Sequence, residues 1–429
     1  MRIPENCRLR KCTNAFFLSN AMISFSWTTI LFLLVASTFA ETPPLPLPSY
    51  RFSSGGTALH VPVEVIAEVL VFVRAQVNDH PGWFILDNAS QGFTVDREYA
   101  RKIALQSSGS AAARGGGSNE IQAGVVRDVQ ISLPGLDLTH RNLIAIALKP
   151  LEPSIGHEVD GIIGSRLFDD FVVVVDYEHR WVSIYSPKEY KPSEKGTVLT
   201  VRVDEHGFQF IDATIALPGV EPIAGSFLID GGANTYADIY KAFSDAHHIP
   251  PPTIKLLDEP GTSTAGTTLS RDGRADLIGV GPYSIKNPPI TFAQDTEGLM
   301  ASRDYAGLIG SESLEHFTVA FDSPGKRLSL TPNRNYAEPA KYDESGLRIR
   351  AEGPGFRKFV VGRVLPQSPA ADAGFERGDV IESIDHSSAE EMTLTEIRSM
   401  FCRSEVRYSI GIMRGNHRLR VALRLRPLL

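Results

Sequence analysis

The stretch FLIDGGANTYAD (227–238) places one carboxylate, Asp230, between an apolar run and a turn that begins with two glycines. The stretch FILDNASQGFTVD (84–96) has the same form around Asp87. Apolar and aromatic residues before each acid predict a buried strand, and the small residues after it predict a tight turn. A short helical pattern follows each turn. The two stretches therefore indicate two copies of one strand–Asp–turn–helix unit.

A second pair of similar segments lies downstream of the first pair. Residues 160–187, DGIIGSRLFDDFVVVVDYEHRWVSIYSP, parallel residues 305–332, YAGLIGSESLEHFTVAFDSPGKRLSLTP. Asp87 and Asp230 are 143 residues apart, while Gly161 and Gly307 are 146 residues apart. Because two separate segments keep nearly one offset, the chain contains an internal repeat. We expect two copies of one lobe, at 57–195 and 196–335.

The composition of this repeat and the positions of its turn-forming residues indicate a mainly β fold. Short β-branched and aromatic runs broken by Gly, Pro, Asn and Asp dominate residues 57–335, and long helical periods are scarce. The runs FVVVVDY and FTVAFDS predict buried strands, and we expect the acids near their ends, Asp176 and Asp322, to stabilise turns. The formal net charge of −7 and the lack of a long basic block argue against a nucleic-acid partner.

The N-terminal residues have the form of an export signal. Arg8, Arg10 and Lys11 precede the apolar run 22–40, which ends at Ala40, a suitable cleavage position. We therefore expect a signal peptide at 1–40 and an exported, periplasmic or secreted extracellular protein. The alternative is an uncleaved membrane anchor, and we expect membrane association only in that case. Cleavage leaves Cys402 as the only cysteine, so no internal disulfide is expected.

Two polar segments separate the repeat from its surroundings. Residues 41–56 are rich in Pro, Ser and Gly and predict a linker, and residues 333–346 predict a second one. In the C-terminal part, residues 393–401 have apolar side chains at helical spacing after Thr393, a candidate N-cap. The alternation of RLRVALRLR (418–426) predicts an edge strand with a solvated arginine face.

Paired carboxylates such as Asp87 and Asp230 can act together as a general acid and base. Two carboxyl groups held about 3 Å apart cannot both ionise, so the pair keeps one proton and titrates as a unit. The charged member can activate a water, and the protonated member can polarise a carbonyl. Duplication of a lobe can bring two such turns face to face, as in a twofold dimer contact.

These motifs resemble the aspartic peptidase family, in particular the retropepsin-like branch with both lobes in one chain. The family has Asp-Thr/Ser-Gly-Ala/Ser after an apolar strand, and later two apolar residues and a glycine. The first motif corresponds to 87–90 and 230–233, and the second to 162–164 and 308–310. The resemblance covers most of 57–335. It implies a bilobal pepsin/retropepsin-like fold of pseudo-twofold symmetry, an Asp87–Asp230 catalytic dyad, and peptide or protein substrates without metal or cofactor.

The resemblance also assigns the residues around the dyad. Those expected to support it are Asn88, Ser90, Gly231, Gly232 and Ala233. Asn88 and Gly231 stand where the family has a hydroxyl residue, and Ala89 stands where it has a glycine. The glycine-rich stretches 113–124 and 261–273 correspond to the hairpin that covers substrate in the family. Flexible surface loops are the alternative for both stretches.

The C-terminal residues 345–429 resemble a PDZ domain, and the stretch SPAADAGFERGD carries the resemblance. Such domains bind an extended peptide at a sheet edge, usually by its free C-terminal carboxylate. The resemblance implies a groove between strand 358–364 and helix 393–401. The residues expected to line it are Gly353, Gly355, Phe356, Val360 and Ile397. The alternative is a domain that only packs against the lobes.

The sequence therefore predicts an exported aspartic endopeptidase with a PDZ domain that recruits protein C-termini. The rival hypothesis is a catalytically inactive, protease-like protein that binds peptides or acts as a scaffold. The choice between the two hypotheses depends on three positions that depart from the family motif, Asn88, Ala89 and Gly231.

Overall fold

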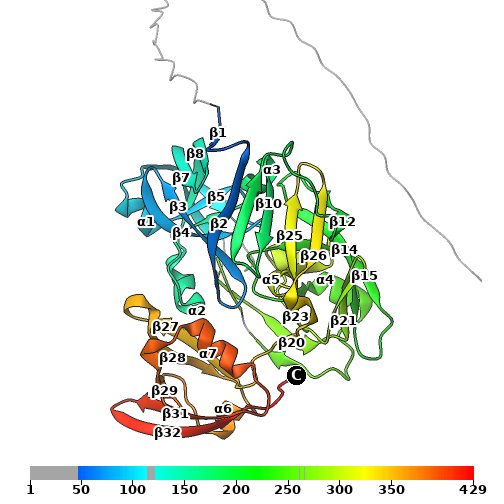
Figure 1. Cartoon of the computed structure of the whole chain (residues 1–429). Coiled ribbons are helices and arrows are strands. Elements are labelled where there is room, and N and C mark those ends of the chain that lie inside the picture. The colour runs from blue at the N-terminus through cyan, green and yellow to red at the C-terminus, as the bar shows by residue number, and fades with distance from the viewer. Residues whose placement is uncertain (1–46, 114–120, 260, 265) are drawn as a thin grey trace, which may run out of the picture. The chain divides into compact units, whose positions relative to one another are not determined.

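The computed structural model describes residues 47–113, 121–259, 261–264 and 266–429, which are mainly β (Figure 1). These residues belong to one compact unit. The predicted signal peptide lies outside the described residues. Among those that are described, no helix is both long and apolar enough to cross a membrane.

The first lobe is built from mostly antiparallel strands with short helices at their ends. Its strands are β1 (Ser49–Phe52), β2 (Thr57–Ile66), β3 (Leu70–Val77), β4 (His80–Leu86), β5 (Phe93–Asp96), β6 (Ser107–Ala113), β7 (Ile121–Leu133), β8 (Leu136–Ile146), β9 (Gly161–Ile163), β10 (Val172–Asp176) and β11 (Trp181–Tyr185). Its helices are α1 (Arg97–Lys102), η1 (Lys149–Leu151), α2 (Glu152–Ile155) and α3 (Ser165–Asp170).

The second lobe has the same kind of construction. Its strands are β12 (Thr197–Thr200), β13 (Arg202–Val203), β14 (Gln209–Ala216), β15 (Ile223–Asp230), β16 (Ala237–Ile239), β17 (Leu257–Asp258), β18 (Gly261–Ser263), β19 (Gly266–Thr268), β20 (Ser270–Arg274), β21 (Leu277–Val280), β22 (Tyr283–Lys286), β23 (Pro289–Ala293), β24 (Gly307–Gly310), β25 (Phe317–Asp322) and β26 (Arg327–Pro332). Its helices are α4 (Lys241–His247), η2 (Leu299–Ala301), α5 (Ser311–Leu314) and η3 (Arg334–Ala337).

Strand pairing confirms the internal repeat. In the first lobe β4 runs parallel to β9, and β9 runs antiparallel to β5. In the second lobe β15 runs parallel to β24, and β24 runs antiparallel to β16. Each Asp turn connects the first and last strand of its trio, so the two acids occupy equivalent places. The repeated apolar patterns at 84–86 and 227–229 produce this equivalence, because each forms the buried strand before its acid.

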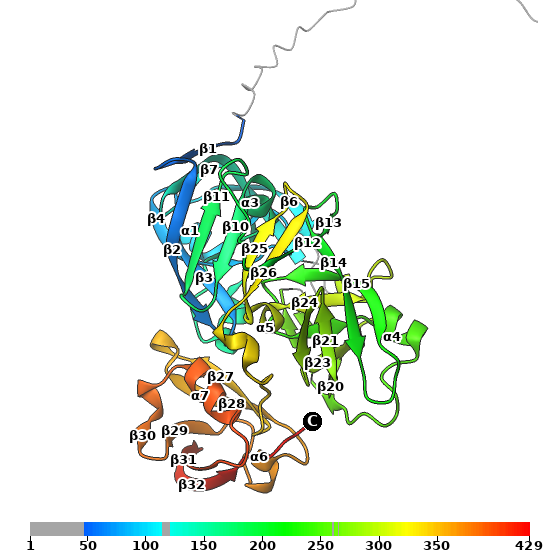
Figure 2. The ribbon, with the colours of Figure 1, turned by 45° about the vertical axis from the view of Figure 1, so that its right-hand side comes forward.

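The two lobes meet along a pair of equivalent strands. β10 and β25 pair antiparallel, with Val173 opposite Phe321 and Val175 opposite Val319 (Figure 2). Their side chains are buried, as the apolar runs predict. Asp176 and Asp322 hold the turns that follow, since their Oδ1 atoms accept from the backbone N–H of His179 (3.0 Å) and Gly325 (2.8 Å). Their expected role in turns is confirmed.

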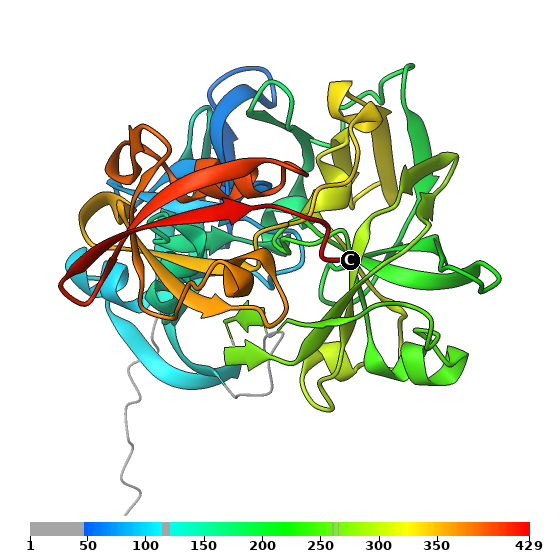
Figure 3. The same cartoon turned by 90° about the horizontal axis from the view of Figure 1, so that it is seen from below.

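A separate hydrophobic core lies in the C-terminal module, which we define as residues 345–429. Its strands are β27 (Leu347–Glu352), β28 (Lys358–Val364), β29 (Val380–Ile384), β30 (Ser387–Ser388), β31 (Arg407–Arg414) and β32 (His417–Arg424). Its helices are η4 (Pro354–Phe356), α6 (Pro369–Asp372), η5 (Ala389–Glu391) and α7 (Leu394–Phe401). The predicted cap of α7 is confirmed, because Thr393 and Glu396 form a capping box. Figure 3 shows the predicted edge strand β32 in red, paired on one side with β31.

Two expectations were wrong, one about the linker before the first lobe and one about the groove in the C-terminal module. Residues 49–52 are not part of a linker, because β1 pairs with β8. The expected groove beside strand 358–364 is also absent, since β28 pairs with β27 on one side and β29 on the other. A strand that is paired on both sides offers no edge to a peptide. The two end strands of this sheet are β27 and β32, and β27 is contacted by α7 and by α2 of the first lobe.

Candidate active site

The first acid of the predicted dyad, Asp87, directly follows β4. Its backbone N–H donates to the Ile163 carbonyl at 3.0 Å, which ties the start of the turn to β9. Its Oδ1 accepts from the Ala89 backbone N–H at 2.9 Å. A backbone donor aimed at the carboxylate favours its charged form. The turn therefore orients the carboxylate as the short residues in the motif predict.

The second acid, Asp230, ends β15 opposite Gly310 of β24. Its Oδ1 accepts from the Gly232 backbone N–H at 2.8 Å. The geometry repeats that of the first turn, with the donor two residues after the acid in both cases. Each acid keeps part of its surface exposed to solvent, so both can reach a bound molecule.

The two acids come together at Gly232. A Cβ on Gly232 would overlap the carboxyl group of Asp87. The same glycine donates its N–H to Asp230, so one residue of the second turn contacts both carboxylates. Gly232 therefore provides the space that lets the two acids approach, which a residue with a side chain would fill.

Burial and proximity change the acidity of both groups. Burial, and next the negative charge of Asp230, raise the pKa of Asp87 to about 8. Burial raises the pKa of Asp230 to about 6, against the lowering effect of the Gly232 and Ala233 backbone amides. The two groups titrate as a pair, because each charge affects the other. Between these pH values the pair holds one proton.

Asn88 joins the two lobes beneath the acids. Its Nδ2 donates to the Ile229 carbonyl at 2.7 Å, and its Oδ1 accepts from the Gly231 N–H at 2.8 Å. Asn88 is 2% exposed, so both bonds are shielded from water. One amide side chain thus bonds to the residues on both sides of Asp230. The side chain missing at Gly231 is not needed for these bonds.

Gly231 and Asn88 fit one another in size. A Cβ on Gly231 would lie 3.0 Å from Asn88 Oδ1, which is tighter than ordinary contact. The glycine also accepts at its carbonyl from Ser311 Oγ at 2.6 Å. The departures from the family motif are therefore complementary, since the larger amide in one turn uses the space left by the glycine in the other.

The remaining residues of the two turns hold the short helices behind them. The Ser90 and Ala233 carbonyls accept from the N–H groups of Ser165 and Ser311, at 2.7 and 2.8 Å. These bonds anchor the starts of α3 and α5. The backbone of Ala89 does not adopt a positive φ, so a residue other than glycine is unstrained at that position.

A row of polar side chains in the second lobe was not predicted from the sequence. Thr291 of β23 lies opposite Asp238 of β16 and Asp272 of β20. Thr291 Oγ1 donates to Asp272 Oδ1 at 2.9 Å, whereas Asp238 Oδ1 has no hydrogen-bond partner among the described residues. Burial raises the pKa of Asp238 to about 7 and that of Asp272 to about 6. Only the strand register brings these residues together, so no local motif could have revealed them.

The two glycine-rich stretches contribute to hairpins. β6 pairs with β7, although residues 114–120 between them lie outside the described residues. β18 pairs with β19, with Gly261 opposite Thr268. The strands therefore stand at the positions where the family resemblance places hairpins. Whether they cover a substrate stays a prediction.

The residues expected to bind a peptide in the C-terminal module are not brought together. Gly355 and Phe356 line a cavity of about 530 Å³ shared with first-lobe residues, among them Trp83 and His157. Gly353 lies at the start of the same turn, between β27 and β28. Val360 and Ile397 are instead buried in the module. The turn and the two buried residues therefore do not form one groove.

Comparisons with known proteins support the first lobe. A family profile described as aspartyl protease matches residues 73–167. The matched segment contains Asp87 and residues 162–164, and it ends before the second lobe. The chain thus carries an aspartyl-protease-like segment, which supports a peptidase-type function.

Two other comparisons add little. The solved structure of a photosystem II D1 C-terminal processing protease matches 20% of this chain and 23% of its own length, with 20% identity and a TM-score of 0.19. The chain thus spans less than a quarter of that protein, and a likeness so low carries no argument. The comparison with curated proteins found no match.

Proposed function

We propose that the protein is an exported aspartic endopeptidase that uses Asp87 and Asp230 as its catalytic dyad. The observation that carries the proposal is the meeting of both acids at Gly232, with Asn88 bonded across the lobes below them. Two equivalent, partly exposed carboxylates with raised pKa values are what an acid–base pair requires. An inactive peptide-binding protein is less well supported, because the altered residues support the pair and do not disrupt it.

The mechanism follows from the shared proton. The charged acid removes a proton from a water molecule as the water attacks a peptide carbonyl carbon. The protonated acid donates a hydrogen bond to the carbonyl oxygen as negative charge develops there. The proton taken from water then passes to the leaving nitrogen, the carbon–nitrogen bond breaks, and the pair again holds one proton. All these proton transfers use side chains that the chain itself provides.

Cleavage of a peptide library tests the proposal. The exported protein and its Asp230→Asn variant are incubated with the library from pH 4 to pH 9, and products are identified by mass spectrometry. Asp212→Asn is the matched control, because Asp212 is an exposed acid of the same lobe. We expect cleavage by the wild type and the control only. Equal cleavage by Asp230→Asn would refute the dyad, and no cleavage by any of the three would favour the binding protein.

We further propose that the C-terminal module is a PDZ domain that recruits peptide tails at β27. β27 is one of the two end strands of its sheet. It lies beside α7, whose Arg398 Nη2 donates to the Ile349 carbonyl at 3.2 Å, and beside α2 of the first lobe, so a bound peptide must displace these contacts. An added strand would take its backbone partners from this edge. Fluorescence anisotropy with a labelled peptide tests this, because binding should require a free C-terminal carboxylate. Equal binding of the C-terminally amidated peptide would contradict carboxylate recognition.

A further inference from the structure

Ser311 is the first residue of α5 and contacts the turn that carries Asp230 at two points. Its backbone N–H donates to the Ala233 carbonyl at 2.8 Å, and its Oγ donates to the Gly231 carbonyl at 2.6 Å. Ser311 is 0% exposed, so both bonds are shielded from water. A shielded hydrogen bond is stronger than one that water can replace. The two contacts lie on both sides of Gly232 and therefore hold it in place.

The bond to the Gly231 carbonyl acts on Asp230 through a single peptide group. The Gly231 carbonyl and the Gly232 N–H belong to the same group, which is planar and trans, so they point in opposite directions. Ser311 binds one end of this group, while the other end donates to Asp230 Oδ1 at 2.8 Å. A hydrogen bond at the carbonyl also polarises the group and makes its N–H a better donor. Ser311 thus orients and strengthens the bond that Asp230 accepts.

The equivalent serine of the first lobe, Ser165, directs its hydroxyl elsewhere. Its N–H donates to the Ser90 carbonyl at 2.7 Å, as that of Ser311 does to Ala233. Its Oγ, however, donates to the His206 carbonyl at 3.2 Å. A serine hydroxyl has one proton to donate, so that of Ser165 is used outside the first turn. The repeat keeps the serine in both lobes, but only Ser311 gives its hydroxyl proton to an Asp turn.

The bond from Gly232 affects the acidity of Asp230. Burial raises the pKa of Asp230 to about 6, and the Gly232 and Ala233 amides oppose this rise because they stabilise the charged form. The other titratable groups that face Asp230 come from the first turn, from β16 and from the residue after β16: Asp87, Asp238 and Tyr240. Tyr177 lies beside the Ser311 hydroxyl, and burial raises its pKa, so it stays uncharged at neutral pH. A change at Ser311 therefore reaches Asp230 through the peptide group.

We propose that Ser311 is a positioning residue for the reaction, because its hydroxyl fixes the peptide group whose N–H holds the carboxylate of Asp230. The inference rests on the proposed peptidase function and adds to it a residue outside the two turns. Ser311 acts only through the turn. It keeps Asp230 oriented and favours its charged form, which is the form that takes a proton from water. Ser165 has no such role, so only one of the two equivalent serines supports catalysis.

The matched variants Ser311→Ala and Ser165→Ala test this inference, since each removes one buried hydroxyl at an equivalent position. Cleavage of the best library peptide is measured from pH 4 to pH 9. Ser311→Ala should lower kcat about tenfold with little change in KM. It should also move the acid limb of kcat/KM upward by about one pH unit, because charged Asp230 loses support. Ser165→Ala should keep the wild-type profile, and Ser311→Thr, which retains the hydroxyl, should recover most of it.

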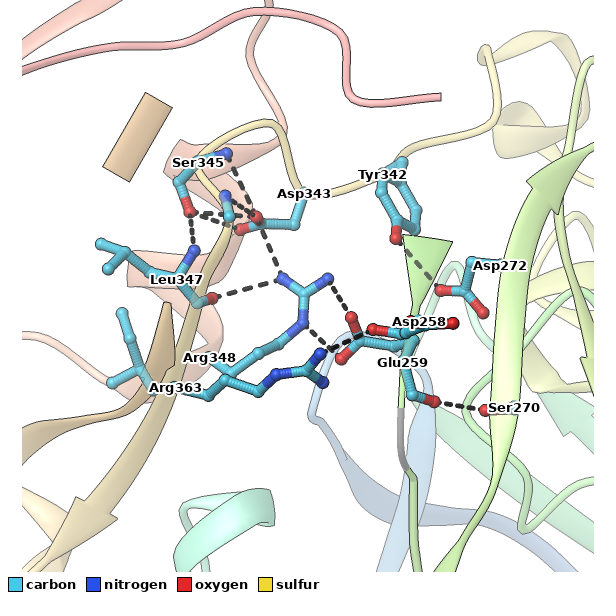
Figure 4. A network of polar contacts seen from close by, with 12 residues as sticks. Asp258, Glu259, Ser270, Asp272, Tyr342, Asp343, Ser345, Leu347, Arg348 and Arg363 are labelled. Atoms are coloured by element: carbon cyan, nitrogen blue, oxygen red, sulfur yellow. Dashed lines mark hydrogen bonds and ion pairs between the residues drawn. The ribbon is translucent and has the colours of Figure 1, made fainter. Parts of the chain in front are cut away.

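A second control separates positioning from a general loss of stability. Tyr342→Phe removes another hydroxyl bond to this lobe, the one from Tyr342 Oη to Asp272 Oδ2 at 3.1 Å (Figure 4). Asp272 lies on β20, which β23, β16 and β24 separate from β15 in the sheet. Tyr342→Phe and Ser311→Ala should both lower the melting temperature, but only Ser311→Ala should move the acid limb. An equal shift in both variants would contradict the positioning role.

Titration by NMR gives a result that does not depend on turnover. The carboxyl carbon signals of aspartate-labelled protein are followed over the same pH range, and Asp230→Asn assigns the dyad. Ser311→Ala should raise the lower of the two apparent pKa values of the dyad, whereas Ser165→Ala should leave both in place. An unchanged pKa in folded Ser311→Ala would overturn the inference, even if peptides are cleaved. A raised pKa in a protein that cleaves no peptide would support the positioning and contradict the proposed peptidase function.

Discussion

The two Asp turns of this protein occupy equivalent places but contribute different things. The first turn, 87–90, supplies a side chain, since Asn88 reaches across the lobes with both ends of its amide. The second turn, 230–233, supplies space, since Gly231 accommodates Asn88 and Gly232 accommodates Asp87. The two units thus share one arrangement of strands, while their turns are complementary. The strands of the two lobes are equivalent, whereas the residues beneath the two acids differ.

Loss of either acid should have the largest effect. We expect Asp87→Asn and Asp230→Asn each to lower kcat/KM about 10³-fold or more, because neither remaining carboxyl can provide both acid and base. Steady-state cleavage of the best library peptide measures this. A much smaller loss in one variant would show that the two turns differ in chemistry as well as in support.

Closing the space in the second turn should have the next largest effect. The Gly232→Ala variant places a methyl group against the Asp87 carboxyl group and should lower kcat/KM about 100-fold. The matched variant Ala89→Gly changes the equivalent position of the first turn and should remain within about threefold of wild type. Equal effects of the two variants would contradict the proposed division between the turns.

Removal of the bridging amide should reduce stability more than chemistry. Asn88→Ala leaves the buried Gly231 N–H and the Ile229 carbonyl without partners, which costs on the order of 2–4 kcal/mol in unfolding free energy. Urea unfolding followed by tryptophan fluorescence measures this loss. Gly231→Ala should also destabilise by crowding Asn88, and the double variant should lose less than the sum of the two single variants. Simple additivity would show that the residues act independently.

The acidic row in the second lobe should produce a smaller effect that depends on pH. An aspartate in the unfolded chain titrates near 3.8, whereas burial raises the folded pKa of Asp238 to about 7 and that of Asp272 to about 6. The folded state therefore binds protons more tightly. The stability that these two acids contribute is greatest at acid pH, falls as pH rises from about 4 to about 7, and is lost above that.

Calorimetric unfolding from pH 4 to pH 8 measures this dependence. The melting temperature should fall by a few degrees over the range, and Asp238→Asn should make the fall less steep. Asp212→Asn, which changes an exposed acid, should leave it unaltered. If the melting temperature depends on pH equally in Asp238→Asn and wild type, Asp238 does not contribute to this pH dependence.

The strands before Asp87 and Asp230 and the turns that carry these acids could be predicted from the sequence, because they depend on local patterns repeated at one offset. The bridging role of Asn88 could not, since its partners Ile229 and Gly231 lie 141 and 143 residues away. The Asp238–Thr291–Asp272 row depends on strand register, which no single segment encodes. The peptide groove of the C-terminal module was predicted beside β28 and is absent there for a similar reason. Local pattern predicts that a strand exists, but the pairing of β28 on both sides is a property of the whole sheet.

The pH dependence of kcat/KM tests the central claim, that Asp87 and Asp230 act with one shared proton. Below about pH 6 both acids are protonated and neither can activate water, and above about pH 8 neither has a proton to donate. We therefore predict a bell-shaped profile whose limbs lie near these values. A profile with a single limb, or one that Asp230→Asn leaves unchanged, would contradict the claim.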